Sequence, residues 1–122
     1  MLSSYDMAGD IVMDNCIKSN QDLKDAKKEI YILTKPPHND RTKLCIKMIE
    51  NSMNAILYLA GDGVYNLMSS SIEILPMERI FACKEDMDAR GIQARKKATV
   101  LVGFYKNLVE DVMGSSDRVY TF

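Results

Sequence analysis

The run NAILYLA at residues 54–60 decides the predicted fold, because it is apolar after its first residue and ends at the glycine turn Gly61-Asp62-Gly63. A strand covered on one face alternates apolar and polar residues, whereas a strand covered on both faces is continuously apolar. Four further runs are of the same kind and rich in β-branched or aromatic residues: residues 29–34, 79–83, 98–102 and 118–122. The chain is therefore predicted to form five short strands in a mainly parallel sheet.

Between these runs, apolar residues recur at helical spacing. The first helix is expected to start after Asn39 or Asp40, and the last to end at Gly114. A middle helix is expected to stop at Pro76, although residues 72–75 (IEIL) also fit an extended segment, and residues 84–90 form a short helical turn closed by Gly91. The apolar stripes are Leu44, Cys45, Met48 and Ile49; Val64, Leu67, Met68 and Leu75; and Phe104, Leu108, Val109, Val112 and Met113. This alternation predicts an α/β protein, a three-layer α/β/α sandwich of Rossmann-like (flavodoxin-like) type.

The length and composition indicate a single domain with no strong overall electrostatic field. The chain has 122 residues and a formal net charge of −1, so nothing in its overall charge would attract nucleic acid or an anionic membrane. No apolar run approaches the roughly 20 residues of a membrane span. The first residues include acids where a signal peptide would have basic residues, so we expect a cytoplasmic protein. Residues 1–28 are read as an arm or extra helix, and residues 29–122 as the α/β domain.

The cysteines exclude two kinds of site. Cys16, Cys45 and Cys83 are odd in number and widely spaced, which is not the pattern of a disulfide framework. No Cys-x-x-Cys or cysteine–histidine pairing suggests zinc, and we expect no metal and no cofactor. Cys45 lies on an apolar helical stripe and is predicted to be a core residue, whereas Cys16 falls in the arm and is given no role.

Ligands of an open parallel sheet bind beyond the carboxyl ends of its strands. Cys83 lies at such an end and precedes a helical turn, so its sulfur is expected near unpaired backbone N–H groups. Those groups and Lys84 favour the thiolate, whereas Glu85 and Asp86 oppose it, which leaves the direction of the pKa shift open. The simpler interpretation is that Cys83 is a small buried apolar residue.

Other strand ends offer weaker candidates. Gly61 and Gly63 permit unusual backbone angles or close approach to a partner, and Asp62 can accept a hydrogen bond or cap the next helix. His38, the only histidine, lies in the loop KPPHND. The basic cluster at residues 95–97 is read as a solvated face. No glycine-rich phosphate loop, flavodoxin-type Ser/Thr loop, receiver-type acidic cluster or Ser-His-Asp set is present.

Two stretches, YLAGDGVYNL at 58–67 and IFACKEDMDARGI at 80–92, resemble the DsrE/DsrH family of sulfur-relay proteins, which includes the Tus subunits. The segments DGVYN and DRVYTF are similar to the DsrE (TusD) branch. The segment KEDMDARGI, with ATVLVGFYKNLVEDVM after it, is similar to the DsrH (TusB) branch. The resemblance covers residues 29–122 and implies a Rossmann-like fold, oligomers of like subunits and transfer of persulfide sulfur between cysteines.

The resemblance also implies an active cysteine. In the DsrE branch that cysteine lies eight residues before the glycine of an Arg-Gly pair, and Cys83 stands at this separation from Gly91. The charged Lys-Glu-Asp that follows Cys83 is instead DsrH-like, and DsrH-type subunits often act as partners of the sulfur carrier. The chain therefore mixes the two patterns.

Two hypotheses follow. In the first, Cys83 carries persulfide sulfur from a donor protein to an acceptor thiol, Lys84 stabilises the anionic persulfide, and three residues of neighbouring loops border the site: Asp62, Gly63 and His38. In the second, the chain is a non-catalytic subunit or binding module with a buried, unreactive Cys83 and a large apolar interface. Both predict a homo-oligomer or a hetero-oligomer with related subunits, without direct contact with nucleic acid or membrane. The sequence leaves the pathway open.

Overall fold

The computed structural model describes residues 28–114 and 116–122, which form a five-stranded, all-parallel sheet. The strand order is β4-β3-β2-β1-β5, and each neighbouring pair is parallel. The strands are β1 (Lys28–Leu33), β2 (Ala55–Leu59), β3 (Ile80–Cys83), β4 (Thr99–Leu101) and β5 (Ser116–Thr121). The prediction of five short strands in a parallel sheet is confirmed.

The central strand β2 explains why its sequence is continuously apolar. All five of its residues are buried, and it pairs with β1 on one side and β3 on the other. Successive side chains point to opposite faces of the sheet. Leu57 and Leu59 enter one core, and Ile56 and Tyr58 enter the other.

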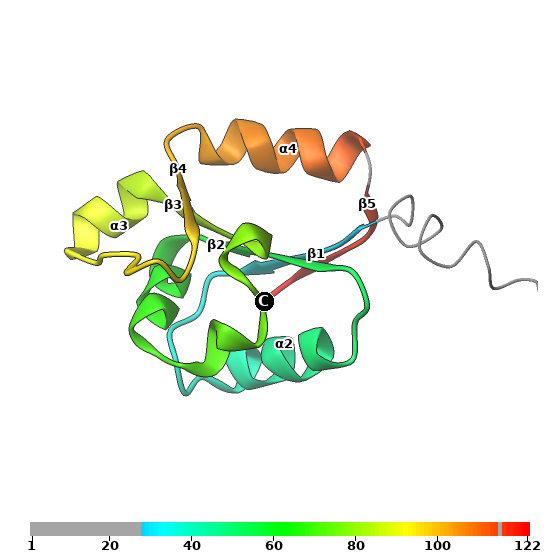
Figure 1. The fold of residues 1–122 in the computed structure, drawn as a ribbon, viewed down its shortest axis with the longest axis horizontal. Coiled ribbons are helices and arrows are strands. Elements are labelled where there is room, and N and C mark those ends of the chain that lie inside the picture. Colours follow the sequence, from blue (N-terminus) through cyan, green and yellow to red (C-terminus); the bar gives the residue numbers. More distant parts are fainter. Residues whose placement is uncertain (1–27, 115) are drawn as a thin grey trace, which may run out of the picture.

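Helices cover both faces of the sheet (Figure 1). The helix α4 (Phe104–Gly114) lies over one face, where Phe104 packs with Ile56 and Tyr58. The helix α2 (Asp40–Glu50) lies on the opposite face, and the short helix α3 (Lys84–Arg90) adds Met87 to the core on the α2 side. This is the three-layer arrangement that the sequence predicted.

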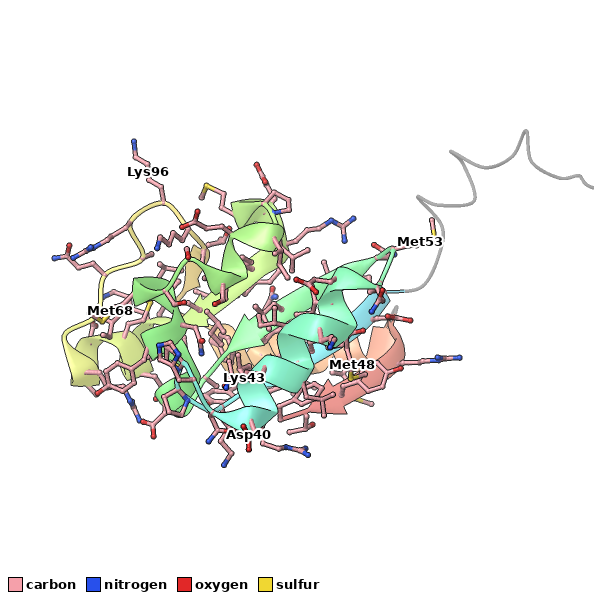
Figure 2. All side chains as sticks on the ribbon, turned by 90° about the horizontal axis from the view of Figure 1, so that it is seen from below. Asp40, Lys43, Met48, Met53, Met68 and Lys96 are labelled. Atoms are coloured by element: carbon pink, nitrogen blue, oxygen red, sulfur yellow. The ribbon has the colours of Figure 1, made fainter. Side chains whose placement is uncertain are left out.

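Local sequence signals set several helix boundaries. The Asn39 side chain accepts a hydrogen bond of 2.8 Å from the backbone N–H of Arg41, so Asn39 rather than Asp40 is the N-cap of α2. Gly91 ends α3 in the left-handed conformation, with φ of 67°, as its position predicted. Figure 2 shows α2 from the side that faces away from the sheet, with Asp40 at its beginning.

The middle segment differs from the prediction. In place of one helix up to Pro76 there are three short 3₁₀ helices: η1 (Gly61–Met68), η2 (Ser71–Ile74) and η3 (Met77–Arg79). Extended backbone at Ser69 and Leu75 separates them, and Met68 is exposed. The extended alternative for residues 72–75 is also wrong, because η2 occupies all but the last of them. Val64, Leu67 and Ile72 are nevertheless buried in the core, which explains the apolar pattern.

Two apolar stripes are narrower than predicted. In α4, Phe104 is buried, but Val109 and Met113 are exposed. In α2, Leu44 is exposed, whereas Cys45 is fully buried, as the sequence predicted. The arm at residues 1–28 and Cys16 lie outside the described residues, apart from Lys28, which opens β1. No helix in the described part of the chain is long and apolar enough to cross a membrane.

Candidate functional site

Cys83 is the last residue of β3 and the N-cap of α3, at the carboxyl end of the sheet. Its side chain points into the core beneath α4, together with Ala60 and Phe104. Only 1% of Cys83 is exposed. The strand end and the helical turn are where the sequence predicted them, but the thiol has little access to solvent.

The groups around the thiol favour its protonated form. The S–H group of Cys83 donates to Oε1 of Glu85 across 3.4 Å. Burial raises the pKa of Cys83 above its usual value. The backbone of Asp86 lowers it, and hydrogen bonds to the carboxylates of Glu85 and Asp86 raise it again. The net direction is upward, which answers the question that the sequence left open.

Tyr105 of α4 belongs to the same group of residues. Burial raises the pKa of its hydroxyl, and the negative charges of Asp86 and of a Cys83 thiolate raise it further. The pKa of Tyr105 therefore depends on the charge of the site around Cys83, although 58% of Tyr105 is exposed. The sequence analysis did not identify Tyr105, because nothing in its local sequence links the start of α4 to the end of β3.

The positive charge of Lys84 does not offset the negative charge of the carboxylates around Cys83. Its ammonium group forms an ion pair with Asp88, one helical turn further on, at 2.8 Å. The bond to Asp88 raises the pKa of Lys84. The cation next to Cys83 in sequence is therefore engaged along the exposed side of α3.

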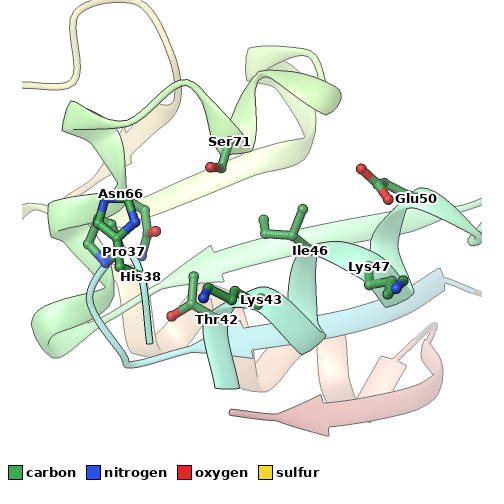
Figure 3. A pocket seen from close by; sticks show the side chains of 9 residues that line it. All are labelled: Pro37, His38, Thr42, Lys43, Ile46, Lys47, Glu50, Asn66 and Ser71. Carbon is green, nitrogen blue, oxygen red and sulfur yellow. The ribbon is translucent and has the colours of Figure 1, made fainter. Parts of the chain in front are cut away.

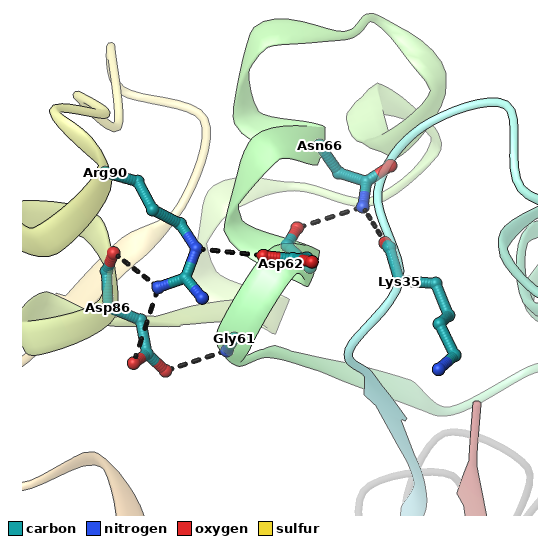
Figure 4. Close-up of polar contacts among 7 residues, drawn as sticks. Lys35, Gly61, Asp62, Asn66, Asp86 and Arg90 are labelled. Atoms are coloured by element: carbon teal, nitrogen blue, oxygen red, sulfur yellow. Dashed lines mark hydrogen bonds and ion pairs between the residues drawn. The ribbon is translucent and has the colours of Figure 1, made fainter.

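Asp62 is tied to α3 by a network of polar contacts (Figure 4). Nε of Arg90 binds Oδ1 of Asp62 at 3.1 Å, and Nη1 of Arg90 donates to the backbone carbonyl of Asp86 at 3.2 Å. The Asp86 carboxylate in turn accepts the backbone N–H of Gly61 at 2.7 Å. Asp86 and Arg90 are four residues apart on a helix, a spacing from which the pairing could have been predicted.

Gly63 has a packing role in the described structure. A Cβ atom at this position would lie 1.9 Å from the backbone oxygen of Leu33, so only glycine lets η1 approach the end of β1. Gly61 meets no such obstacle but has a φ of 54°. Gly61 thus uses the unusual backbone angle that the sequence analysis expected, whereas the close approach at Gly63 is to β1 of the same chain; a role toward a partner stays a prediction.

His38 lies apart from the other predicted site residues. It lines a cavity between α2 and the η1–η2 region, and Cys83, Lys84, Asp62 and Gly63 are not among the residues that form it. In the basic loop, Lys97 pairs with Glu73 at 3.3 Å. The fold thus joins the turn that contains Asp62 to α3, which follows Cys83, whereas His38 lines a separate cavity.

Comparison with known proteins adds one match. A family model described as "DsrH like protein" covers residues 34–117, which include both the glycine turn and all of α3. No curated protein resembles the chain closely enough to be matched to it. Within the described residues, no group of three or more His, Cys, Asp or Glu side chains is arranged to hold a metal ion.

Proposed function

The chain belongs to the DsrH-like family of sulfur-relay-related proteins, and on that premise we propose that it is a supporting subunit of a sulfur-relay complex. The observation that carries this proposal is the state of Cys83, a thiol with 1% exposure and a raised pKa. In this role the chain shapes the complex and docks its sulfur-carrying partner. Cys83 then serves as part of the core.

Sulfur transfer requires a thiolate that can reach a persulfide. The carboxylates of Glu85 and Asp86 both raise the pKa of Cys83, and their negative charge disfavours a thiolate or an anionic persulfide at this position. The nearest cation in sequence, Lys84, is paired with Asp88. These features support a Cys83 thiol that stays protonated at neutral pH.

The outer face of α4 supports the same proposal. Tyr105, Val109 and Met113 follow one another at four-residue spacing, so they lie on one side of the helix, and more than half of each is exposed. Val102, just before the helix, is also exposed. An apolar stripe of this kind on a small domain is typical of a protein contact. We assign it to a related α/β subunit of the complex.

A second candidate function is that of persulfide carrier, and one observation favours it. Glu85, which accepts the hydrogen bond of the thiol, is itself exposed, so its rotation on partner binding would release the thiol from this bond. Glu85 would take the thiol proton, and the Cys83 thiolate would attack the outer sulfur of the donor persulfide. The donor would leave as a thiolate with the electron pair of the broken S–S bond, so that the exchange involves no net oxidation.

Intact-mass measurement distinguishes the two candidates. A Cys16→Ser/Cys45→Ser variant, which retains Cys83 alone, is exposed to inorganic polysulfide at pH 7, folded and in urea. For a supporting subunit, we expect the urea sample to gain sulfur and the folded sample to gain none. Gain of sulfur by the folded sample at the rate of the unfolded one would contradict the proposal and identify Cys83 as a carrier. A Cys83→Ser chain is the control for adducts elsewhere.

A further inference from the structure

We propose that the cavity between α2, the loop of residues 35–39 and the η1–η2 region binds an amino-bearing mononucleotide. Its volume is about 360 Å³, within the usual range of small-molecule sites. It lies on the α2 side of the sheet, whereas Cys83 packs under α4 on the other side. The inference is therefore independent of the role of Cys83.

Asn66 provides the first argument. It is fully buried, and Nδ2 donates to two backbone carbonyls, those of Lys35 and Gly63, each at 2.9 Å. Since both partners are acceptors, the orientation of the amide is fixed, and Oδ1 points away from them. Oδ1 has no hydrogen-bond partner among the described residues. Buried polar atoms are nearly always paired, so this oxygen indicates a missing N–H or O–H donor.

Asn66 lines the cavity, and its Oδ1 is covered in the unliganded protein, so a donor bound in the cavity reaches this oxygen once the neighbouring side chains shift. Figure 3 shows Asn66 at one end of the cavity, beside Pro37 and His38. His38 has a φ of 70°, a left-handed conformation that residues other than glycine rarely adopt. The His38 side chain is exposed, and together with the proline ring it forms a rim at the end of the cavity where Asn66 lies.

The α2 wall carries positive charge. Lys43 and Lys47 are one turn apart on α2 and both line the cavity, and neither forms an ion pair within the described part of the chain. Ser71 adds a hydroxyl that accepts from Ser69 and can still donate. Glu50 is the one acid among the lining residues. This wall suits a phosphate, which lysine ammonium groups bind as point charges.

The middle of the cavity is suited to a ring. Ile46 lies between the lysines in the helix, and Figure 3 shows it projecting into the space between Ser71 and Lys43. A base over Ile46 could direct its amino N–H to Oδ1 of Asn66 and its phosphate to the lysines. Such a ligand would provide partners for Oδ1 of Asn66 and for the two lysines, which have none within the described residues, whereas inorganic phosphate or a neutral nucleoside would serve only one of these. No phosphate-binding glycine loop is required, because side chains supply the charge.

The test is an NMR titration of the full ¹⁵N-labelled chain with three probes: adenosine 5′-monophosphate, adenosine and inorganic phosphate. We expect the monophosphate to shift the amide signals of His38, Lys43, Asn66 and Ser71, and to bind at least about tenfold more tightly than either other probe. Lys43→Gln/Lys47→Gln should weaken its binding about tenfold. Lys106→Gln, on the exposed part of α4, is the matched control and should leave the affinity unchanged.

Three results would overturn the inference: no shifts at millimolar monophosphate, equal affinity for inorganic phosphate, or shifts that the lysine variant leaves unchanged. Both lysines are exposed, so their replacement by glutamine should leave the fold intact. The spectrum of the unliganded variant verifies this. Repeating the titration with Cys83→Ser separates the cavity from the proposed function, since binding here should not depend on the thiol.

Discussion

The carboxylate of Asp86 accepts a hydrogen bond of 2.7 Å from the backbone N–H of Gly61, and thereby joins α3 to the turn that follows β2. These two residues belong to the two sequence stretches that carry the family resemblance. Arg90 completes the connection by binding Asp62 and the Asp86 carbonyl. One function of these two stretches is thus to hold two neighbouring loops together at the carboxyl edge of the sheet.

Replacing Arg90 with alanine tests this connection. The change removes the hydrogen bonds to Asp62 and to the Asp86 carbonyl, and we expect a loss of about 1 kcal/mol in the free energy of unfolding, since the contacts are partly exposed. Urea denaturation measures it. Lys106→Ala, at an exposed position of α4, should change stability much less. An equal effect of both variants would show that the network does not stabilise the fold.

The acidic surrounding of Cys83 predicts a second result. Asp86→Asn retains an oxygen that can accept the Gly61 N–H, but it removes a negative charge that raises the pKa of Cys83. The thiol pKa should therefore fall, and an NMR titration that follows the ¹³Cβ signal of Cys83 in the folded chain should show a lower midpoint pH. The variant that retains Cys83 as its only cysteine provides the background. Asp88→Asn is the matched control: the Asp88 carboxylate pairs with Lys84 instead, so its loss should leave the titration of Cys83 nearly unchanged.

Cys45 predicts how stability depends on alkaline pH. Burial raises its pKa to about 12 in the folded chain, against 9.0 for an unperturbed thiol. Between these values the unfolded chain loses this proton and the folded chain keeps it, so stability falls as pH rises above 9. Ionisation of this thiol in the unfolded state alone costs roughly 1.4 kcal/mol at pH 10. Urea denaturation at pH 8 and pH 10 should show a smaller difference for Cys45→Ala than for the unmodified chain.

Gly63 predicts a large packing effect. In Gly63→Ala, the new Cβ would lie 1.9 Å from the backbone oxygen of Leu33, and β1 or η1 would have to move. We expect a loss of roughly 3 kcal/mol in the free energy of unfolding. Gly103→Ala is the matched control, because its Cβ would meet no atom within 4 Å. If both variants unfold at the same urea concentration, the close approach of η1 to β1 does not limit stability.

The sequence predicted the layered fold well because its signals are local. The continuously apolar run of β2, the Asn39 cap and the Gly91 stop each act within a few residues, and each is found in the structure. The middle segment was mispredicted as one helix, because its apolar spacing fits an α-helix and three 3₁₀ helices almost equally. In the structure, extended backbone at Ser69 and Leu75 interrupts the segment, so three short 3₁₀ helices form instead of one α-helix.

The candidate site was predictable only in part. The position of Cys83 at a strand end follows from the sequence, but the direction of its pKa shift depends on which neighbours the fold brings to the sulfur. Lys84 is adjacent in the chain and yet is paired with Asp88, whereas the charge of Cys83 affects the pKa of Tyr105 in a later helix. His38, expected to border this site, lines a different cavity. Cys83 as a sulfur carrier stays a prediction.

The sequence by itself determined the class of fold, the order of the strands along the chain, and the family pattern around the glycine turn and α3. Only the tertiary structure decided which of these residues meet. Arg90 binds Asp62 across 28 positions, and Asn66 binds the carbonyl of Lys35 across 31. The reason is that hydrogen-bonding and apolar preferences act over a few residues, whereas contacts of this length form only once parallel strands have paired and aligned their carboxyl ends.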